Sequence, residues 1–171
     1  MAGRRQGAQS LAALMLIAVP FAGCDAVDTG GDAAAQAGRF DSLFDLLRLA
    51  GEQRAAEMLR QKGARIDENF ANLGQLLFTL PGQAGEGSEL LFAPGNPDKI
   101  EGLTLVPPAD LRITGADVEA RFGAGRRMPA LPNQGWRFAH RDGALNILAV
   151  YDSNPELPSS RVIRLVATPG G

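Results

Sequence analysis

Alternating apolar and polar residues over 135–151 constrain the fold more than any other part of the chain. Asp142-Gly143 lies near the middle of this stretch, and the pair favours a two-residue hairpin turn because Gly accepts a positive φ. That turn places His140 opposite Leu145 and Trp136 opposite Ala149. One face of the hairpin then carries Trp136, Phe138, His140, Leu145, Ile147, Ala149 and Tyr151. The other face carries Arg137, Ala139, Arg141, Ala144 and Asn146, so the pattern predicts a sheet with one buried face.

Two further elements flank this hairpin. Arg161–Ala167 is predicted to be a third strand, with Ile163 and Leu165 facing the core and Arg164 facing the opposite way. Thr114 and Asp117 have the spacing of a capping box. They predict a short helix over Gly115–Phe122 that ends at Gly123.

Helical spacing dominates residues 40–80. Apolar residues recur three or four positions apart, at Phe40, Leu43, Phe44, Leu47 and Ala50, and Gly51 is expected to interrupt the run. A second apolar face follows over 55–59, with Gly63 as its C-terminal cap. Asp67 is predicted to cap a further helix that runs to Leu80 and stops at Pro81.

The middle of the chain carries weaker signals. Residues 82–88 are predicted to be a loop, and Leu90–Phe92 and Leu103–Val106 are predicted to be short strands. We therefore expect a single α+β domain over 39–171. Its N-terminal helical block, 40–80, packs on a small antiparallel sheet, about 103–167, that includes the C-terminal β-hairpin and the third strand.

The first 23 residues have the layout of a secretory signal peptide. Arg4 and Arg5 precede an apolar run, Leu11–Phe21, and two small residues, Ala22 and Gly23, follow the run. The run has eleven residues, whereas a membrane-spanning helix needs about 20. We therefore expect residues 1–23 to be removed.

Phe21-Ala22-Gly23-Cys24 resembles the bacterial lipobox, which implies diacylglycerol transfer to Cys24, cleavage before it and acylation of the new amino group. The alternative is a signal peptide followed by an incidental cysteine. Cys24 is the only cysteine, so no internal disulfide can form. Acyl chains such as palmitate would anchor the protein in the bacterial cell envelope, facing the periplasm or the outer surface. Residues 24–38 would then form a flexible tether. Asp25 favours inner-membrane retention in enteric lipoproteins, but the choice of membrane stays open.

The C-terminal half resembles small envelope lipoproteins of the SmpA/OmlA type and related inhibitor-type α/β repeats. The resemblance rests on Thr114, Asp117, Val118, Phe122, Gly123, Trp136 and the strands at 144–151 and 161–167. It implies a small α+β fold and a partner in the envelope.

Catalytic chemistry has few candidates in this sequence. His140 is the only histidine, so a site with two or three histidine ligands is excluded, and we expect no metal or cofactor. A Ser-His-Asp arrangement could use only His140, which is more typical of a half-buried strand residue. Gly123–Arg127 lacks the Lys-Ser/Thr pair of a phosphate loop. Asp152 and Glu156 are expected to be solvated loop charges.

Charge and hydropathy leave two functional hypotheses. Removing residues 1–23 takes away two arginines and no acid, which leaves 15 basic and 19 acidic residues, a net charge of −4 that disfavours nucleic acid. The first hypothesis is a non-enzymatic envelope protein that binds another protein or has a structural role, with possible contacts at Arg126, Arg127, Arg137 and Arg141. The alternative is a lipid-anchored module that binds a small apolar or lipidic ligand between its helices and its sheet. The ligand would occupy a pocket bounded by Phe44, Leu73, Leu77 and the Trp136 face.

Overall fold

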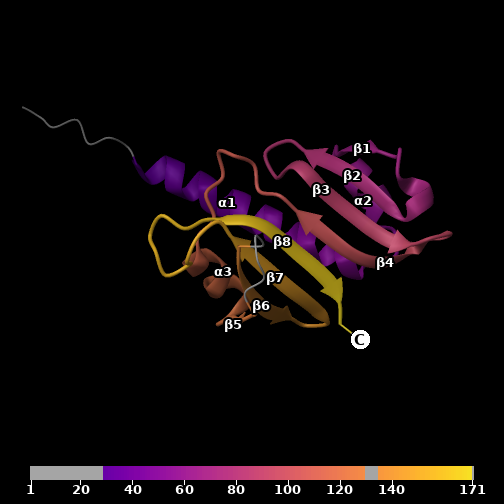
Figure 1. Cartoon of the computed structure of the whole chain (residues 1–171). Coiled ribbons are helices and arrows are strands. Elements are labelled where there is room, and N and C mark those ends of the chain that lie inside the picture. The colour runs from indigo at the N-terminus through magenta and orange to yellow at the C-terminus, as the bar shows by residue number, and fades with distance from the viewer. Residues whose placement is uncertain (1–28, 130–134, 171) are drawn as a thin grey trace, which may run out of the picture.

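The computed structural model describes residues 29–129 and 135–170 of the chain. Within them, one eight-stranded antiparallel sheet carries the helices on one of its faces (Figure 1). This arrangement confirms the predicted α+β class. The predicted signal peptide, the proposed lipidation site Cys24 and the first residues of the predicted tether lie outside the described residues.

The sheet consists of two four-stranded meanders. The first contains β1 (Arg65–Asp67), β2 (Gln75–Leu80), β3 (Ala84–Ala93) and β4 (Asn96–Leu105), and the second contains β5 (Arg126–Arg127), β6 (Trp136–Asp142), β7 (Leu145–Tyr151) and β8 (Val162–Pro169). The strand order β1-β2-β3-β4-β8-β7-β6-β5 joins the meanders through an antiparallel β4–β8 pair. The first meander follows α1 (Thr29–Leu47), the 3-10 turn η1 (Arg48–Gly51) and α2 (Ala55–Gln61), and the second follows α3 (Gly115–Phe122).

The core lies between the helices and one face of the sheet. Leu43, Leu46 and Leu47 of α1 are fully buried, as is Leu59 of α2. They meet the inward leucines of the strands, Leu90, Leu103 and Leu165. Each buried leucine stabilises the fold by about 1.5–3 kcal/mol. On α3, Phe122 packs edge to face on Phe44, with ring centroids 5.1 Å apart.

The structure differs from the predicted flexible tether at residues 24–38. Helix α1 begins at Thr29, so ten residues that the sequence assigned to the tether are helical. Residues 33–37 contain four alanines, and alanine has the highest intrinsic helix propensity. Because the apolar face of residues 40–47 is anchored in the core, extending the helix backwards avoids the cost of a new nucleus.

The helix predicted from Asp67 to Leu80 is wrong. The chain there forms the end of β1, the short 3-10 turn η2 (Ala71–Leu73) and strand β2. Burial alternates along β2, with Leu76, Phe78 and Leu80 inward, so a period of two prevails over the helical spacing. Gly74 separates η2 from β2 with φ 79°, and a Cβ at this position would collide with the carbonyl oxygen of Phe92.

The strands of the first meander are also longer than predicted. Strand β3 begins at Ala84, inside the loop predicted over 82–88, and the predicted Leu90–Phe92 strand is its final part. The predicted Leu103–Val106 strand corresponds to the end of β4. The capping box at Thr114 and Asp117, the helix over Gly115–Phe122 and its stop at Gly123 are confirmed.

The faces predicted for the C-terminal hairpin are confirmed, but the predicted register is wrong by two residues. Asp142 pairs with Leu145, His140 with Ile147 and Trp136 with Tyr151. The two loop residues are therefore Gly143 and Ala144, and Gly143 at the first loop position has φ 58°, a conformation that glycine adopts without strain. A shift of two positions leaves every side chain on its predicted face.

The inward orientation predicted for Ile163 is wrong. Tyr151 pairs with Val162 while Val150 pairs with Arg164, so Ile163 is an extra residue in a β-bulge. The bulge turns Val162 into the core and leaves Ile163 40% exposed. Leu165 faces the core as predicted.

Candidate partner-binding face

One face of the sheet carries no helix, and we call it the open face. Pairing across the strands places Arg126, Ala139, Leu148 and Val166 in one row on this face. The next row, Phe138, Ala149 and Leu165, points to the core. The helices lie behind the strands in Figure 1 and cover only the face to which this core row belongs.

Three of the four arginines singled out in the sequence lie together on the open face. Arg126 is in the row of Ala139, and Arg137 and Arg141 flank that row on β6. Arg164 joins them, because Val150 pairs with Arg137 on one side and with Arg164 on the other. Arg164 was predicted to lie on the face opposite the core but was not grouped with the other arginines. Its predicted orientation was the signal that could have found it.

Arg127 is separated from the other arginines by the sheet. It pairs with Phe138, whose side chain belongs to the core face. Its guanidinium carbon lies 4.2 Å from the centroid of the Trp136 ring, which is cation–π geometry. Arg127 therefore supports the hairpin and does not contribute to the basic surface of the open face.

The arginines of the open face differ in how they are held. Arg137 donates through Nη2 to the carbonyl oxygen of Pro129 at 2.6 Å, and Arg141 donates through Nε to the carbonyl oxygen of Gly143 at 3.3 Å. Within the part of the chain that the structure describes, Arg126 and Arg164 form no side-chain hydrogen bond or ion pair. No carboxylate neutralises either arginine there, so both present their charge to solvent.

His140 has a structural position. Its side chain is only 6% exposed, and its Nδ1 atom lies 3.0 Å from the carbonyl oxygen of Gly123. A carbonyl oxygen only accepts, so Nδ1 carries the proton. Gly125 packs so closely on the imidazole ring that a Cβ would collide with it. His140 therefore fixes the loop from Gly123 to Gly125 that leads into β5.

Asp152 and Glu156 do not form a carboxylate pair. Asp152 accepts from the backbone N–H of Arg161 at 3.0 Å and from its Nε atom at 3.2 Å. The backbone hydrogen bond from Arg161, with the side chains of Ser153 and Arg161, holds the pKa of Asp152 below its usual value. These contacts close the loop before β8 and leave Asp152 as a charged acceptor.

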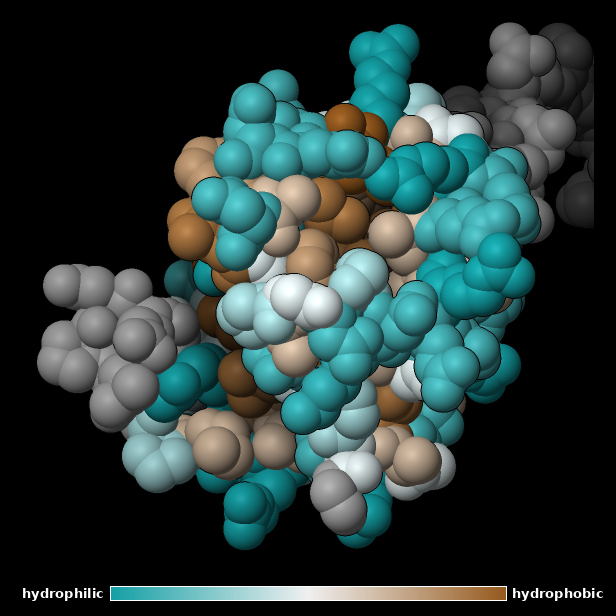
Figure 2. All heavy atoms as spheres, turned by 90° about the vertical axis from the view of Figure 1, so that its right-hand side faces the viewer, coloured by the Kyte–Doolittle hydropathy of each residue, from teal (hydrophilic) through white to brown (hydrophobic). Residues whose placement is uncertain are grey.

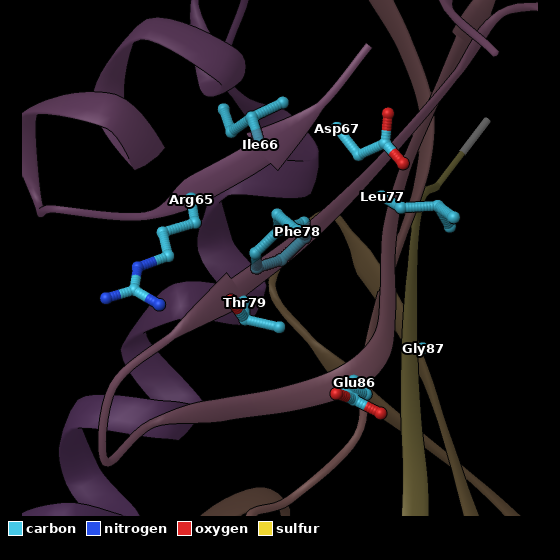
Figure 3. Close-up of a pocket in the computed structure, with 8 residues that line it drawn as sticks. All are labelled: Arg65, Ile66, Asp67, Leu77, Phe78, Thr79, Glu86 and Gly87. Carbon is cyan, nitrogen blue, oxygen red and sulfur yellow. The ribbon is translucent and has the colours of Figure 1, made fainter. Parts of the chain in front are cut away.

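A hollow of about 360 Å³ lies beside the first two strands, and Figure 3 shows its lining. Its charged side chains are Arg65 and Asp67 of β1 and Glu86 of β3. In Figure 3 they project away from one another and do not converge on a common point. Convergent polar groups are typical of an active site, and this hollow does not provide them.

The residues expected to bound a ligand pocket do not come together. Phe44 is buried in the core, Leu73 on η2 is 68% exposed, and Leu77 pairs with Glu89 on the open face. Figure 2 views the end of the molecule that carries the first meander and shows apolar residues in a hollow bordered by hydrophilic ones. Phe70 and Leu73 of the η2 region are the exposed large apolar residues of that meander.

No group of three or more His, Cys, Asp or Glu suited to a metal ion occurs among the described residues. Over 29–129 and 135–170, no helix is both long and apolar enough to cross a membrane. No family model, no curated protein and no solved structure matches this chain.

Proposed function

We propose that this chain is a lipid-anchored bacterial envelope protein with a non-enzymatic role, and that its open face binds another protein. One observation carries the proposal: Arg126, Arg137 and Arg141, with Arg164, share the only sheet face that the described helices leave uncovered. Arginine is enriched at the centres of protein interfaces because its planar fork binds carboxylates and backbone carbonyls together.

The packing of the open face supports a protein partner. Between the arginines lie the half-buried apolar side chains of Leu148, Val150 and Val166. An apolar centre with a charged rim is the usual anatomy of a protein interface. The proposed mature chain has a net charge of −4, whereas this part of the open face gathers four arginines, which suits an acidic partner.

The anchor limits where this face can lie. If Cys24 carries the acyl chains, only four residues separate it from Thr29, the start of α1. Four residues span at most about 14 Å when extended. The domain would therefore be held near the bilayer by a helical stalk, and its partner would be an envelope protein within reach of that position.

Site-specific photocrosslinking in the native membrane tests the proposal. A photoreactive amino acid is placed at Asn146, which is exposed on the open face, or at Gln61, which is exposed on the helical side. We expect one defined protein adduct from position 146 and none of that mass from position 61. Equal adducts from both positions, or adducts from position 61 alone, would refute binding through the open face.

A further inference from the structure

The β-bulge in β8 places an apolar side chain at the centre of the basic region. Ile163 has no counterpart on β7, because its neighbours Val162 and Arg164 take the positions opposite Tyr151 and Val150. Its side chain is 40% exposed, whereas Val162 before it is buried. An ordinary strand would bury Ile163 in the core, so the bulge presents this residue to solvent on the open face.

Two hollows meet at Ile163, and together we call them the Ile163 groove. The first, of about 440 Å³, lies on the open face of β6–β8 and has Leu148, Val150 and Val166 as its apolar lining. The second, of about 330 Å³, continues past Ile163 towards Val106, Pro107 and Pro108. Spaces of this size accept one or two large side chains each. The groove therefore suits a narrow occupant that places a few side chains along it.

The charge around the groove differs between its two hollows. Arg137 and Arg164 line the first hollow, which has no acidic lining residue. The second hollow is lined by Arg161 and Glu86, and Arg161 is already paired with Asp152. The second hollow therefore keeps the negative charge of Glu86. The positive charge is concentrated at the first hollow, where Arg137 also donates to the carbonyl oxygen of Pro129 and Arg164 has no side-chain partner among the described residues.

We propose that the Ile163 groove binds an extended acidic segment of a partner protein, with one apolar side chain in the first hollow and a carboxylate against Arg164. This inference rests on the proposed function and adds the chemistry of the partner. An extended segment projects alternate side chains to one side, so apolar and acidic residues in alternation match an apolar floor with arginines at its rim.

Selection from a displayed library of random nonapeptides tests this inference on the full-length protein purified in detergent. We expect the enriched peptides to combine a net negative charge with an apolar residue near the middle. A synthetic peptide of the enriched sequence should bind Ile163→Asp and Arg164→Glu variants at least tenfold more weakly than the original chain. Both positions are exposed, and thermal unfolding of each variant verifies its fold. Lys62→Glu, the same charge change on the helical side, should alter binding by less than twofold.

Several results would overturn the inference. Enriched peptides without an acidic excess, or an equal loss in Lys62→Glu, would exclude the proposed partner chemistry. A dimer that dissociates in Arg164→Glu would make a second copy of the chain the occupant, and binding to phosphatidylglycerol vesicles lost in the same variant would make it a lipid surface. If crosslinking from Asn146 persists in Ile163→Asp and Arg164→Glu, the proposed function stands and the groove assignment fails. Loss of the position 146 specificity itself would refute the proposed function.

Discussion

The guanidinium of Arg127 lies over the indole ring of Trp136, 4.2 Å from the ring centroid, on the face of the hairpin that turns towards the helices. Its neighbour Arg126 points to the open face. Two adjacent arginines of one two-residue strand therefore have different tasks. One covers the indole of the only tryptophan, and the other adds charge to the candidate binding surface.

Replacing these two arginines should separate their roles. Arg127→Ala is expected to destabilise the protein by about 0.5–1 kcal/mol, because it removes a cation–π contact at a partly exposed site. Since the chain has a single tryptophan, its fluorescence spectrum should shift in the same variant. Urea unfolding followed by fluorescence measures both effects. Arg126→Ala is the matched control, and an equal spectral shift in it would contradict the assignment.

The single tyrosine gives a direct pH test of the core. Burial, with a smaller contribution from the charge of Glu119, raises the pKa of Tyr151 to about 12. The neutral phenol is therefore favoured in the folded state, so its contribution to stability is complete below pH 10 and is lost as the pH rises towards 12. The tyrosinate absorbance of the folded protein should titrate near pH 12. A midpoint near pH 10 would show that Tyr151 is solvated, and Tyr151→Phe should abolish the signal.

The bulge in β8 makes neighbouring apolar residues unequal. Leu165→Ala is expected to cost about 2–5 kcal/mol, because Leu165 is fully buried and its truncation leaves a cavity. Ile163→Ala should cost less than about 1 kcal/mol, because that side chain is largely outside the core. Denaturant unfolding of the two variants compares the costs. Similar losses would mean that β8 has the regular register in which both side chains face inward.

The capping box of α3 should contribute measurably to stability. The Thr114 hydroxyl accepts from the backbone N–H of Asp117, and the Asp117 carboxylate accepts from the backbone N–H of Thr114 at 2.8 Å. Thr114→Ala is expected to cost about 1 kcal/mol. Thr114→Ser keeps the hydroxyl and should retain most of the stability. If both variants unfold at the same denaturant concentration, the hydroxyl does not cap the helix.

Local chemistry made the C-terminal half predictable. The capping box at Thr114 and Asp117 and the alternation along residues 136–151 each need only a few neighbouring residues, and both the helix and the hairpin faces are confirmed. The predicted register of the hairpin was wrong because Asp142 and Gly143 were assigned to the loop. In the structure, Asp142 pairs with Leu145 and Gly143 is the first loop residue. The inward orientation predicted for Ile163 was wrong because a β-bulge depends on pairing with the partner strand.

The helical block was less predictable because its leucines fit two periods. Leu73, Leu77 and Leu80 have helical spacing, but Leu76, Phe78 and Leu80 also alternate, and pairing with β3 decides for the strand. The basic cluster shows the same limit. Alternation along β6 places Arg137 and Arg141 on the same face. The orientation of Arg126 and Arg127 depends on how β5 pairs with β6, which the local sequence does not determine.

The proposed location of the protein and the reach of its partner both depend on the proposed anchor at Cys24. The intact mass of the protein from its native membrane, measured with its detergent partitioning beside a Cys24→Ala variant, tests it directly. We predict a chain that begins at Cys24, carries acyl chains and enters the detergent phase, and a variant that loses both properties. An unmodified chain, or one that keeps residues 1–23, would contradict the account.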